Sequence, residues 1–215
     1  MHICAIKPKD TQKIYARKCI INSIDAKSKN IFLNQFHIQG ADKSQIRLGA
    51  YHEQQPDKLL AVMTFTKPRT MMGRDITKYE NAWELSRFAT DTSVCLPGIA
   101  SKMLKHFISI NPPGMVIFSY ADARWSVGNV YDQLGFVNQK LNNPSYWYVV
   151  KGKRMHRWGF RRDIIRENFP EVYDDKLNEY QMMTLLEIDR VWDNGTIRYV
   201  LDTRKIDKDG YPINP

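Results

Sequence analysis

Residues 115–122, MVIFSYAD, are a short and mostly apolar run that follows the chain break NPPG. Such a run is typical of a buried strand in the middle of a sheet. It leads to Ser126, a suitable helix N-cap, and then to NVYDQLGF at 129–136. This sequence predicts one or two helical turns, Gly135 just after their end, and a strand directly afterwards. The fold must therefore hold a buried strand, a short helix and another strand in close succession.

The segments before this run predict helices first and strands second. Apolar residues between 9 and 37 recur at helical spacing, and Gly40 is placed to close the second of two helices. QQPD predicts the turn of a hairpin, and Pro68 ends its second strand. The other expected elements are strands at 46–53, 58–69 and 81–90 and a helix at 97–110 with one apolar face.

The character of the chain changes after residue 152. A strand is expected at 145–152, and the next segment is strongly basic. KLNEYQMMTLLEI at 176–188 predicts a helix, and DRVWDNGTIRYVL at 189–201 predicts a hairpin that turns on DNG. We therefore expect a main domain at 1–152 and a smaller C-terminal extension at 153–215 that packs on it.

Composition narrows the class of protein. The 215 residues are 43% hydrophobic, which suffices for an ordinary core. We expect no membrane span, because no apolar run approaches the ~18 residues that a span needs, and no signal peptide, because the N-terminus lacks an apolar centre. The three cysteines are widely spaced and form no zinc pattern with the histidines, so a reduced, cytoplasmic protein without a metal is expected.

The net charge of +9 suits a polyanionic partner, either nucleic acid or a phosphate-rich cofactor. A basic but inert surface is the alternative.

Two segments resemble motifs of the GNAT family of acyl-CoA-dependent N-acyltransferases. CLPGIA at 95–100 is similar to the acyl-CoA loop, [Q/R]-x-x-G-x-[G/A]: Gly98 and Ala100 match, whereas Cys95 stands in the Gln or Arg position. NVYDQLGF is similar to a later motif with Tyr131 four residues before Gly135. The order of expected elements also resembles that family. The resemblance implies an α+β fold with a mixed, mostly antiparallel sheet between helices, here with a small helix and hairpin extension.

The resemblance implies acetyl-CoA or another acyl-CoA as the cosubstrate. A loop that opens a helix offers backbone N–H groups to a pyrophosphate, and Gly98 lets the backbone approach it. The pantetheine arm would lie between strands 82–90 and 115–122, with a backbone N–H near Phe88 polarising the thioester carbonyl. A plain Pro-Gly turn before an amphipathic helix is the alternative. The expected cofactor contacts are Phe88, Cys95, Gly98, Ile99, Ala100, Ser101, Lys102 and Asn129.

Tyr131 matches the family's general acid, which protonates the departing thiolate. The alternative is a tyrosine that packs on the core. Three residues are candidate bases: Glu84, Asp122 and His37. Each has a structural alternative, namely a Glu84–arginine pair, a turn capped by Asp122 with Arg124, and a histidine at a helix end. Strand alternation places Glu84, Ser86 and Phe88 on one face, and Leu85 and Arg87 on the other.

The segment KGKRMHRWGFRRDIIR at 151–166 holds seven Lys or Arg residues interleaved with Trp158 and Phe160. Cations with aromatic rings suit phosphate contact and base stacking, and a helix with a solvated basic face is the alternative. A DNA base that served as acceptor would be flipped into a pocket between Tyr131, Asp122 and His37. The expected substrate contacts are Arg69, Ser86, Arg87, Ser119, Arg124 and Arg157.

A wider resemblance favours DNA as the partner. Several segments are similar to a GNAT-like domain of bacteriophage proteins, found alone or with homing-endonuclease modules. ELSRF and SYAD are also remotely similar to the Mom family of phage DNA-modification proteins. No GIY-YIG pair or His-Asn-His array is present, so a homing endonuclease that acts alone is not expected.

Three functions remain open. The chain is an N-acyltransferase acting on DNA or a modified nucleotide, an N-acyltransferase acting on a protein or small amine, or a non-catalytic DNA-binding module of GNAT shape. Cys95 favours the third, and Gly98, Ala100 and Tyr131 favour the first two. The sequence does not indicate the oligomeric state.

Overall fold

The structure, a computed structural model, describes residues 11–68, 81–126 and 128–205. The chain forms two compact units. The main unit contains the chain up to Leu141 and from Ile197 onward, and the inserted unit is Asn142–Thr196. These limits differ from the expected domains 1–152 and 153–215, because the strand at 146–150 pairs inside the inserted unit while the strand at 196–202 pairs with the main sheet.

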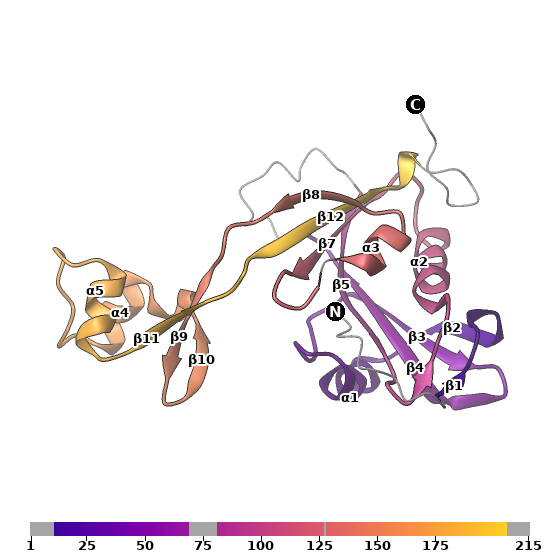
Figure 1. Ribbon diagram of the computed structural model, residues 1–215, viewed down its shortest axis with the longest axis horizontal. Helices are drawn as coiled ribbons and strands as arrows, with labels where there is room; N and C mark the ends of the chain where they lie inside the picture. The colour runs from indigo at the N-terminus through magenta and orange to yellow at the C-terminus, as the bar shows by residue number, and fades with distance from the viewer. Residues whose placement is uncertain (1–10, 69–80, 127, 206–215) are drawn as a thin grey trace. The chain divides into compact units, whose positions relative to one another are not determined.

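The main unit is built on a seven-stranded sheet with the order β2-β3-β4-β5-β7-β12-β8. Neighbours from β2 to β5 are antiparallel, β5 and β7 are parallel, and β12 lies between β7 and β8 (Figure 1). The strands are β2 (Cys19–Ser23), β3 (Ile46–His52), β4 (Gln55–Thr66), β5 (Ala82–Thr90), β7 (Val116–Asp122), β8 (Val137–Leu141) and β12 (Thr196–Asp202). The expected α+β fold with a mixed, mostly antiparallel sheet is confirmed.

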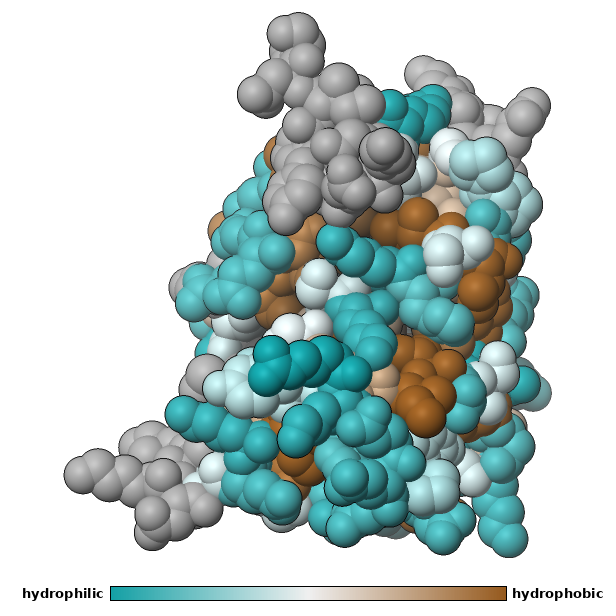
Figure 2. All heavy atoms as spheres, turned by 90° about the vertical axis from the view of Figure 1, so that its right-hand side faces the viewer, coloured by the Kyte–Doolittle hydropathy of each residue, from teal (hydrophilic) through white to brown (hydrophobic). Residues whose placement is uncertain are grey.

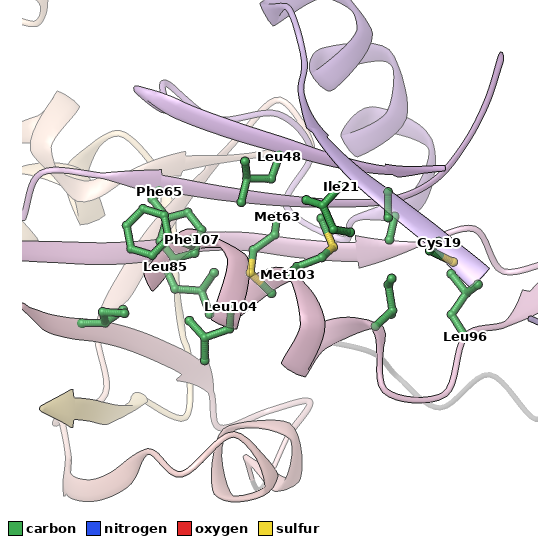
Figure 3. Close-up of a cluster of buried hydrophobic side chains, with 14 of the residues drawn as sticks. Cys19, Ile21, Leu48, Met63, Phe65, Leu85, Leu96, Met103, Leu104 and Phe107 are labelled. Carbon is green, nitrogen blue, oxygen red and sulfur yellow. The ribbon is translucent and has the colours of Figure 1, made fainter. Parts of the chain in front are cut away.

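Two helices cover opposite faces of this sheet. Helix α1 (Ala26–Phe36) begins at Asp25, whose side chain accepts from Ser28 N, and packs through Phe32 and Leu33 on Val62 of β4. Helix α2 (Ile99–Ser109) packs on the alternate β4 residues, and Phe107 stacks on Phe65 with ring centroids 3.5 Å apart (Figure 3). Because neighbouring strand residues point to opposite faces, these contacts define an α1 face and an α2 face of the sheet.

A β-bulge in β5 changes the expected alternation. Phe65 pairs with Leu85 and Thr64 pairs with Arg87, so Ser86 is an extra residue in β5. After the bulge, Phe88 pairs with Met63 and lies on the α2 face with Leu85. The prediction that Glu84, Ser86 and Phe88 share one face is therefore wrong. Glu84, which pairs with Thr66, and Arg87 both lie on the α1 face.

β5 and β7 pair only at their beginnings. Their parallel ladder joins Ala82 with Val116, Trp83 with Ile117 and Glu84 with Phe118, and in the described chain it goes no further. β5 continues to Thr90 and β7 to Asp122. Backbone pairing between these strands thus ends after their third pair, and the expected place of the pantetheine arm is beyond it.

Near the N-terminal end of the described chain, the structure differs from the prediction of two helices. Residues 19–23 form β2, where Cys19 and Ile21 are buried and Ile20 is 48% exposed, a period of two rather than of a helix. Before β2 lie the short strand β1 (Gln12–Lys13), parallel to β6 (Val94–Cys95), and a 3₁₀ turn η1 (Ala16–Lys18).

From the side where α2 and β2 lie, apolar surface forms separate patches among polar side chains (Figure 2).

The inserted unit has a three-stranded sheet with the order β10-β9-β11. Its core gathers Tyr148, Phe160, Ile165, Met182 and Met183. The elements are β9 (Tyr146–Val150), β10 (Lys153–His156), η4 (Arg157–Phe160), α4 (Arg162–Asn168), α5 (Glu179–Leu185) and β11 (Asp189–Trp192). The predicted hairpin over DNG is wrong, because β11 pairs with β9 and β12 pairs with β8. None of the described helices is long and apolar enough to cross a membrane.

Candidate functional site

Tyr131 lies on α3 (Asn129–Gln133), a short helix between two glycines with left-handed backbone, Gly128 (φ 87°) and Gly135 (φ 80°). The tyrosine ring stacks on Tyr199 of β12, with centroids 4.7 Å apart, and meets the edge of Phe136. At Gly128 a Cβ atom would lie 1.7 Å from the Tyr199 hydroxyl, so glycine is required there for two reasons. The short helix thus fixes one ring between two others.

The hydroxyl of Tyr131 reaches the place where β5 and β7 stop pairing. Ser119 follows Phe118, the last paired residue of β7. Its Oγ donates to the Leu85 carbonyl at 2.9 Å and lies 3.0 Å from the Tyr131 hydroxyl oxygen. Ser119 is 1% exposed, so this contact is sheltered from water. A serine hydroxyl has one proton and the carbonyl can only accept, so the neutral tyrosine donates to Ser119.

The surroundings keep Tyr131 protonated. Burial raises its pKa, and the hydrogen bond with Ser119 offsets part of that rise. The charges of Arg87 and Glu84 also reach the hydroxyl: Arg87 lowers the pKa and Glu84 raises it. At neutral pH the side chain is therefore a phenol that can donate a proton. Tyr131, Ser119, Glu84 and Arg87 are the predicted site residues that the structure brings together.

The segment after α1 is held against β4 and β5. Asp42 accepts from Thr64 Oγ1 at 2.7 Å and from Lys29 Nζ at 3.0 Å, and Lys29 is only 2% exposed. Burial raises the pKa of Asp42, but hydrogen bonds from Thr64, Lys29 and Ser86 outweigh it, so the pKa is lowered. Ser86, an expected substrate contact, is thus a partner of Asp42.

Arg87, another expected substrate contact, adds to this attachment. Its Nε donates to the Gly40 carbonyl at 3.3 Å and its Nη1 donates to the Ser86 carbonyl at 2.7 Å. The segment after α1 therefore borders the Glu84–Arg87 side of β5.

The expected acyl-CoA loop opens α2 on a left-handed glycine. Gly98 (φ 79°) is the N-cap of α2 and has no side chain to bind the first-turn N–H groups. The Cys95 and Pro97 carbonyls accept from Ile14 N and Ala16 N, at 2.9 and 3.1 Å, so residues 14–16 run beside the loop. Ala100 and Ser101 are partly exposed. The loop can therefore present backbone N–H groups to an anion.

Other expected cofactor contacts have different surroundings. Ile99 is 2% exposed and its side chain belongs to the core. Lys102 Nζ donates to the Ala16 and Cys19 carbonyls, at 3.0 and 2.5 Å, so it ties α2 to the segment before β2. Phe88 packs against the core on the α2 face, and Asn129 is exposed at the start of α3.

All three candidate bases, Glu84, Asp122 and His37, interact with neighbouring groups. Asp122 forms a two-pronged ion pair with Arg124, with Oδ2 2.6 Å from Nη2 and Oδ1 3.0 Å from Nε. His37 is the C-cap of α1, and its Nδ1 accepts from Gln39 N at 3.1 Å. Arg157 belongs to the inserted unit, and Arg69 lies outside the described residues. Among the described residues, no group of three His, Cys, Asp or Glu side chains could hold a metal.

Sequence reasoning missed several residues that shape this site. Tyr199 lies far from Tyr131 in the chain, and no local pattern links them. The Leu85 carbonyl and Asp42 take part through pairing that depends on the whole sheet. Gly128 carried a usable signal, because a glycine directly before a short helix can serve as its N-cap.

Comparison with known proteins gave no match to a family model and no match among curated proteins. Among solved structures, Arabidopsis thaliana NAA60 in complex with acetyl-CoA matches with a TM-score of 0.45 and 12% identity, over 86% of this chain and 99% of that one. Drosophila melanogaster polyamine N-acetyltransferase matches with a TM-score of 0.44 and 8% identity, over the same shares.

A third match is an acetyltransferase structure from Corynebacterium glutamicum, described as histone acetyltransferase HPA2 and related acetyltransferase. It has a TM-score of 0.34 and 22% identity. This chain aligns over 45% of its own length and spans 55% of that protein. Because all three TM-scores are below 0.5, the functional proposal rests on the geometry of the site.

Proposed function

We propose that the main unit is a GNAT-type N-acyltransferase that moves an acyl group from acyl-CoA to an amine. The observation that carries the proposal is the Tyr131 hydroxyl, which is kept protonated and held by Ser119 where β5 and β7 stop pairing. An acid group at this place suits a reaction that expels a thiolate. The left-handed Gly98 at the start of α2 supports the same function, because it opens a helix toward an anion.

The residues present fit an acyl-CoA. First-turn N–H groups at Ala100 and Ser101 would bind the pyrophosphate, and the backbone of β5 beyond Glu84 would bind the pantetheine arm. A backbone N–H near Phe88 would polarise the thioester carbonyl. Acyl-CoA supplies an activated acyl group, and the protein supplies the orientation and the protons.

The proton transfers can be assigned to two sides of the sheet. Tyr131 belongs to the core on the α2 face, and Glu84 lies on the α1 face. As the amine nitrogen bonds to the carbonyl carbon, Glu84 takes a proton from the amine. As the carbon–sulfur bond breaks, Tyr131 gives its proton to the sulfur. Ser119 can then turn its hydrogen from the Leu85 carbonyl to the phenolate, which stabilises it until it is protonated again.

Of the three candidate bases we propose Glu84. Glu84 belongs to the last residue pair between β5 and β7, and its charge contributes to the raised pKa of Tyr131. Asp122 pairs with Arg124 at the end of β7, and His37 is the C-cap of α1. An acid and a base that act on opposite sides of one thioester account for both transfers.

For the acceptor we propose an amine of DNA or of a modified nucleobase. The net charge of +9 and the basic segment at 151–166 support a polyanionic partner. The resemblance of the sequence to phage GNAT-like domains and, remotely, to the Mom family favours DNA. A protein or small amine remains the second candidate acceptor, and a non-catalytic DNA-binding module is the third possible function.

The test is isothermal titration with acetyl-CoA. We expect micromolar binding by the wild type and its loss in Gly98→Trp, whose side chain would cover the start of α2. The matched control is Gly159→Trp, at an exposed glycine with open space around its Cβ position. No binding by the wild type, or equal loss in both variants, would contradict an acyl-CoA site. Mass analysis of nucleosides from DNA treated with protein and acetyl-CoA would then test the acceptor.

A further inference from the structure

We infer that the inserted unit binds single-stranded nucleic acid through a surface formed by β9, β10 and η4. This surface, here called the Trp–Arg strip, consists of Trp147, Arg154, His156, Arg157, Trp158 and Arg161. This inference rests on the proposed function in one respect: a nucleic acid bound to the strip would be the macromolecule that carries the acceptor amine. Binding itself requires no acyl transfer.

The strip includes the face of the three-stranded sheet that the unit's helices leave open. Tyr148 is fully buried and packs with core residues of α4 and α5. Trp147 is the next residue of β9 and points to the opposite face, directly between His156 of β10 and Val191 of β11. Val191 is 40% exposed and His156 is exposed. The row through Trp147 is therefore accessible.

Two tryptophan rings in this strip lie against arginine side chains. The Arg154 guanidinium is 4.6 Å from the ring centre of Trp147, and His156 meets the edge of that ring at 4.7 Å. Trp158 is 46% exposed, with Arg157 at 5.9 Å and Arg161 at 5.6 Å. His156 joins the two parts, since its Nδ1 accepts from Trp158 N. His156 thus links the Trp147 ring to the start of the segment that holds Trp158. Arg157 also lies over the ring of Tyr146, at 5.3 Å, so it borders the other face of the sheet as well.

The distribution of charge in the inserted unit supports a polyanion as the occupant. Residues 142–196 contain nine Lys or Arg and nine Asp or Glu, so the unit is neutral overall. Residues 151–162 contain six of the cations and no carboxylate. Arg154 and Arg157 have no ion pair with the described carboxylates. The cations are therefore concentrated in this segment, and three of the six, Arg154, Arg157 and Arg161, belong to the strip.

Rings between cations favour a single strand over a duplex. Bases of a single strand can stack on exposed aromatic rings while arginines contact the phosphates. A duplex keeps its bases stacked inside and offers only phosphates to this surface. Charged residues also protect an edge strand such as β10 from pairing with other chains. That role would explain Lys153 and Arg154, but not the partly buried Trp147 or the exposed Trp158.

The test measures binding of the full chain to labelled oligonucleotides by fluorescence anisotropy. The probes are oligothymidylate and oligouridylate of about 20 nucleotides, a duplex of the same length, and inorganic polyphosphate as a competitor. We expect both single strands to bind more tightly than the duplex. The ratio of the affinities for oligothymidylate and oligouridylate then shows whether the surface prefers DNA or RNA. Trp147→Ala and Arg154→Gln should each weaken binding about tenfold.

The matched control is Trp192→Ala. Trp192 is 56% exposed and belongs to the same sheet, but it pairs with Tyr146 on the other face. We expect unchanged binding in this variant. If Trp147→Ala loses its far-UV circular dichroism, Trp158→Ala replaces it, because that ring is exposed.

Three results would overturn the inference: equal binding by Trp147→Ala, Arg154→Gln and wild type; equal binding of duplex and single strand; or complete displacement of the single strand by polyphosphate at equal phosphate concentration. Acetyl-CoA binding is measured on the same samples. Loss of oligonucleotide binding with acetyl-CoA binding retained contradicts only this inference, and the reverse result contradicts only the proposed function.

Discussion

The contact between Ser119 and Tyr131 can be tested through stability before any acceptor is known. Ser119→Ala and Tyr131→Phe each remove one hydroxyl and leave the packing in place. In Tyr131→Phe the aromatic ring would keep its contacts with Tyr199 and Phe136. Ser119→Ala removes the shared partner of two groups, the Leu85 carbonyl and the Tyr131 hydroxyl. Tyr131→Phe removes only one of the two contacts.

The expected costs follow from this asymmetry. Ser119 is 1% exposed, so its removal leaves buried groups without their partner and should cost about 1–3 kcal/mol of unfolding free energy. In Tyr131→Phe the serine keeps the Leu85 carbonyl, and the cost should be about 0.5–1.5 kcal/mol. The double variant should cost less than the sum of the single ones by about 0.5–1.5 kcal/mol, because both remove the same hydrogen bond.

The measurement is urea unfolding of the four proteins, followed by far-UV circular dichroism. The control cycle replaces Ser119→Ala by Ser109→Ala, whose hydroxyl donates to the His106 carbonyl at the end of α2. That pair should be additive within about 0.5 kcal/mol. If the Ser119–Tyr131 cycle is equally additive, the two hydroxyls do not interact and the assignment of Ser119 as the residue that positions Tyr131 is wrong.

The same variants make a kinetic prediction once an acceptor is found. Tyr131→Phe should lower kcat about 100- to 10,000-fold, the usual value of general acid help. Ser119→Ala should lower kcat less than Tyr131→Phe does, and it should move the alkaline limb of the pH–rate profile to higher pH. The sign follows from the hydrogen bond that Ser119 can donate to the phenolate, which lowers the raised pKa of Tyr131, so its removal lets the pKa rise further. An unchanged alkaline limb in Ser119→Ala would argue against Tyr131 as the acid.

Three further outcomes test the same geometry. Gly128→Ala should lower the melting temperature more than Gly152→Ala, because both have positive φ but only at Gly128 would the new Cβ collide with a tyrosine ring, while the one at Gly152 meets open space. Asp42→Asn should cost about 3–5 kcal/mol at pH 7 by leaving the buried Lys29 unpaired. Since the folded pKa of Asp42 is lowered, that difference between variant and wild type should persist above pH ~4 and shrink as pH falls further, in urea titrations at each pH. Glu84→Gln should lower kcat about 100-fold or more, with unchanged acetyl-CoA affinity by calorimetry.

Local signals in the sequence predicted the parts of the site that lie within one segment. The apolar run at 115–122 predicted β7, and the glycine of NVYDQLGF predicted the end of α3, where Gly135 has a φ of 80°. The helix predicted at 97–110 corresponds to α2, and Gly98, expected to let the backbone approach a phosphate, has the left-handed backbone that glycine adopts easily. Each of these features depends on residues that are close together in the sequence, so a single segment is enough to predict it.

Features that depend on partner strands could not be predicted from the sequence. The DNG turn is a strong local hairpin signal, yet Asp193 Oδ1 accepts from Ser145 N and from Gly195 N, and the two flanking strands enter different sheets. Residues 19–23 were expected to be helical, but pairing with β3 outweighed that spacing. In both cases long-range pairing decided between structures that the local sequence allows.

The bulge at Ser86 also depends on pairing between strands, and it affects the residues of the candidate site. With regular alternation, Glu84 and Arg87 would point to opposite faces of β5, and Phe88 would leave the core. The extra residue places both charges on the α1 face while Leu85 and Phe88 stay on the α2 face. Tyr131 lies on the α2 face, where β5 and β7 no longer pair, and both charges affect the pKa of its hydroxyl. The bulge therefore sets Glu84 and Arg87 on one side of β5 and Tyr131 on the other. In the proposed mechanism, a thioester between β5 and β7 would lie between the base and the acid.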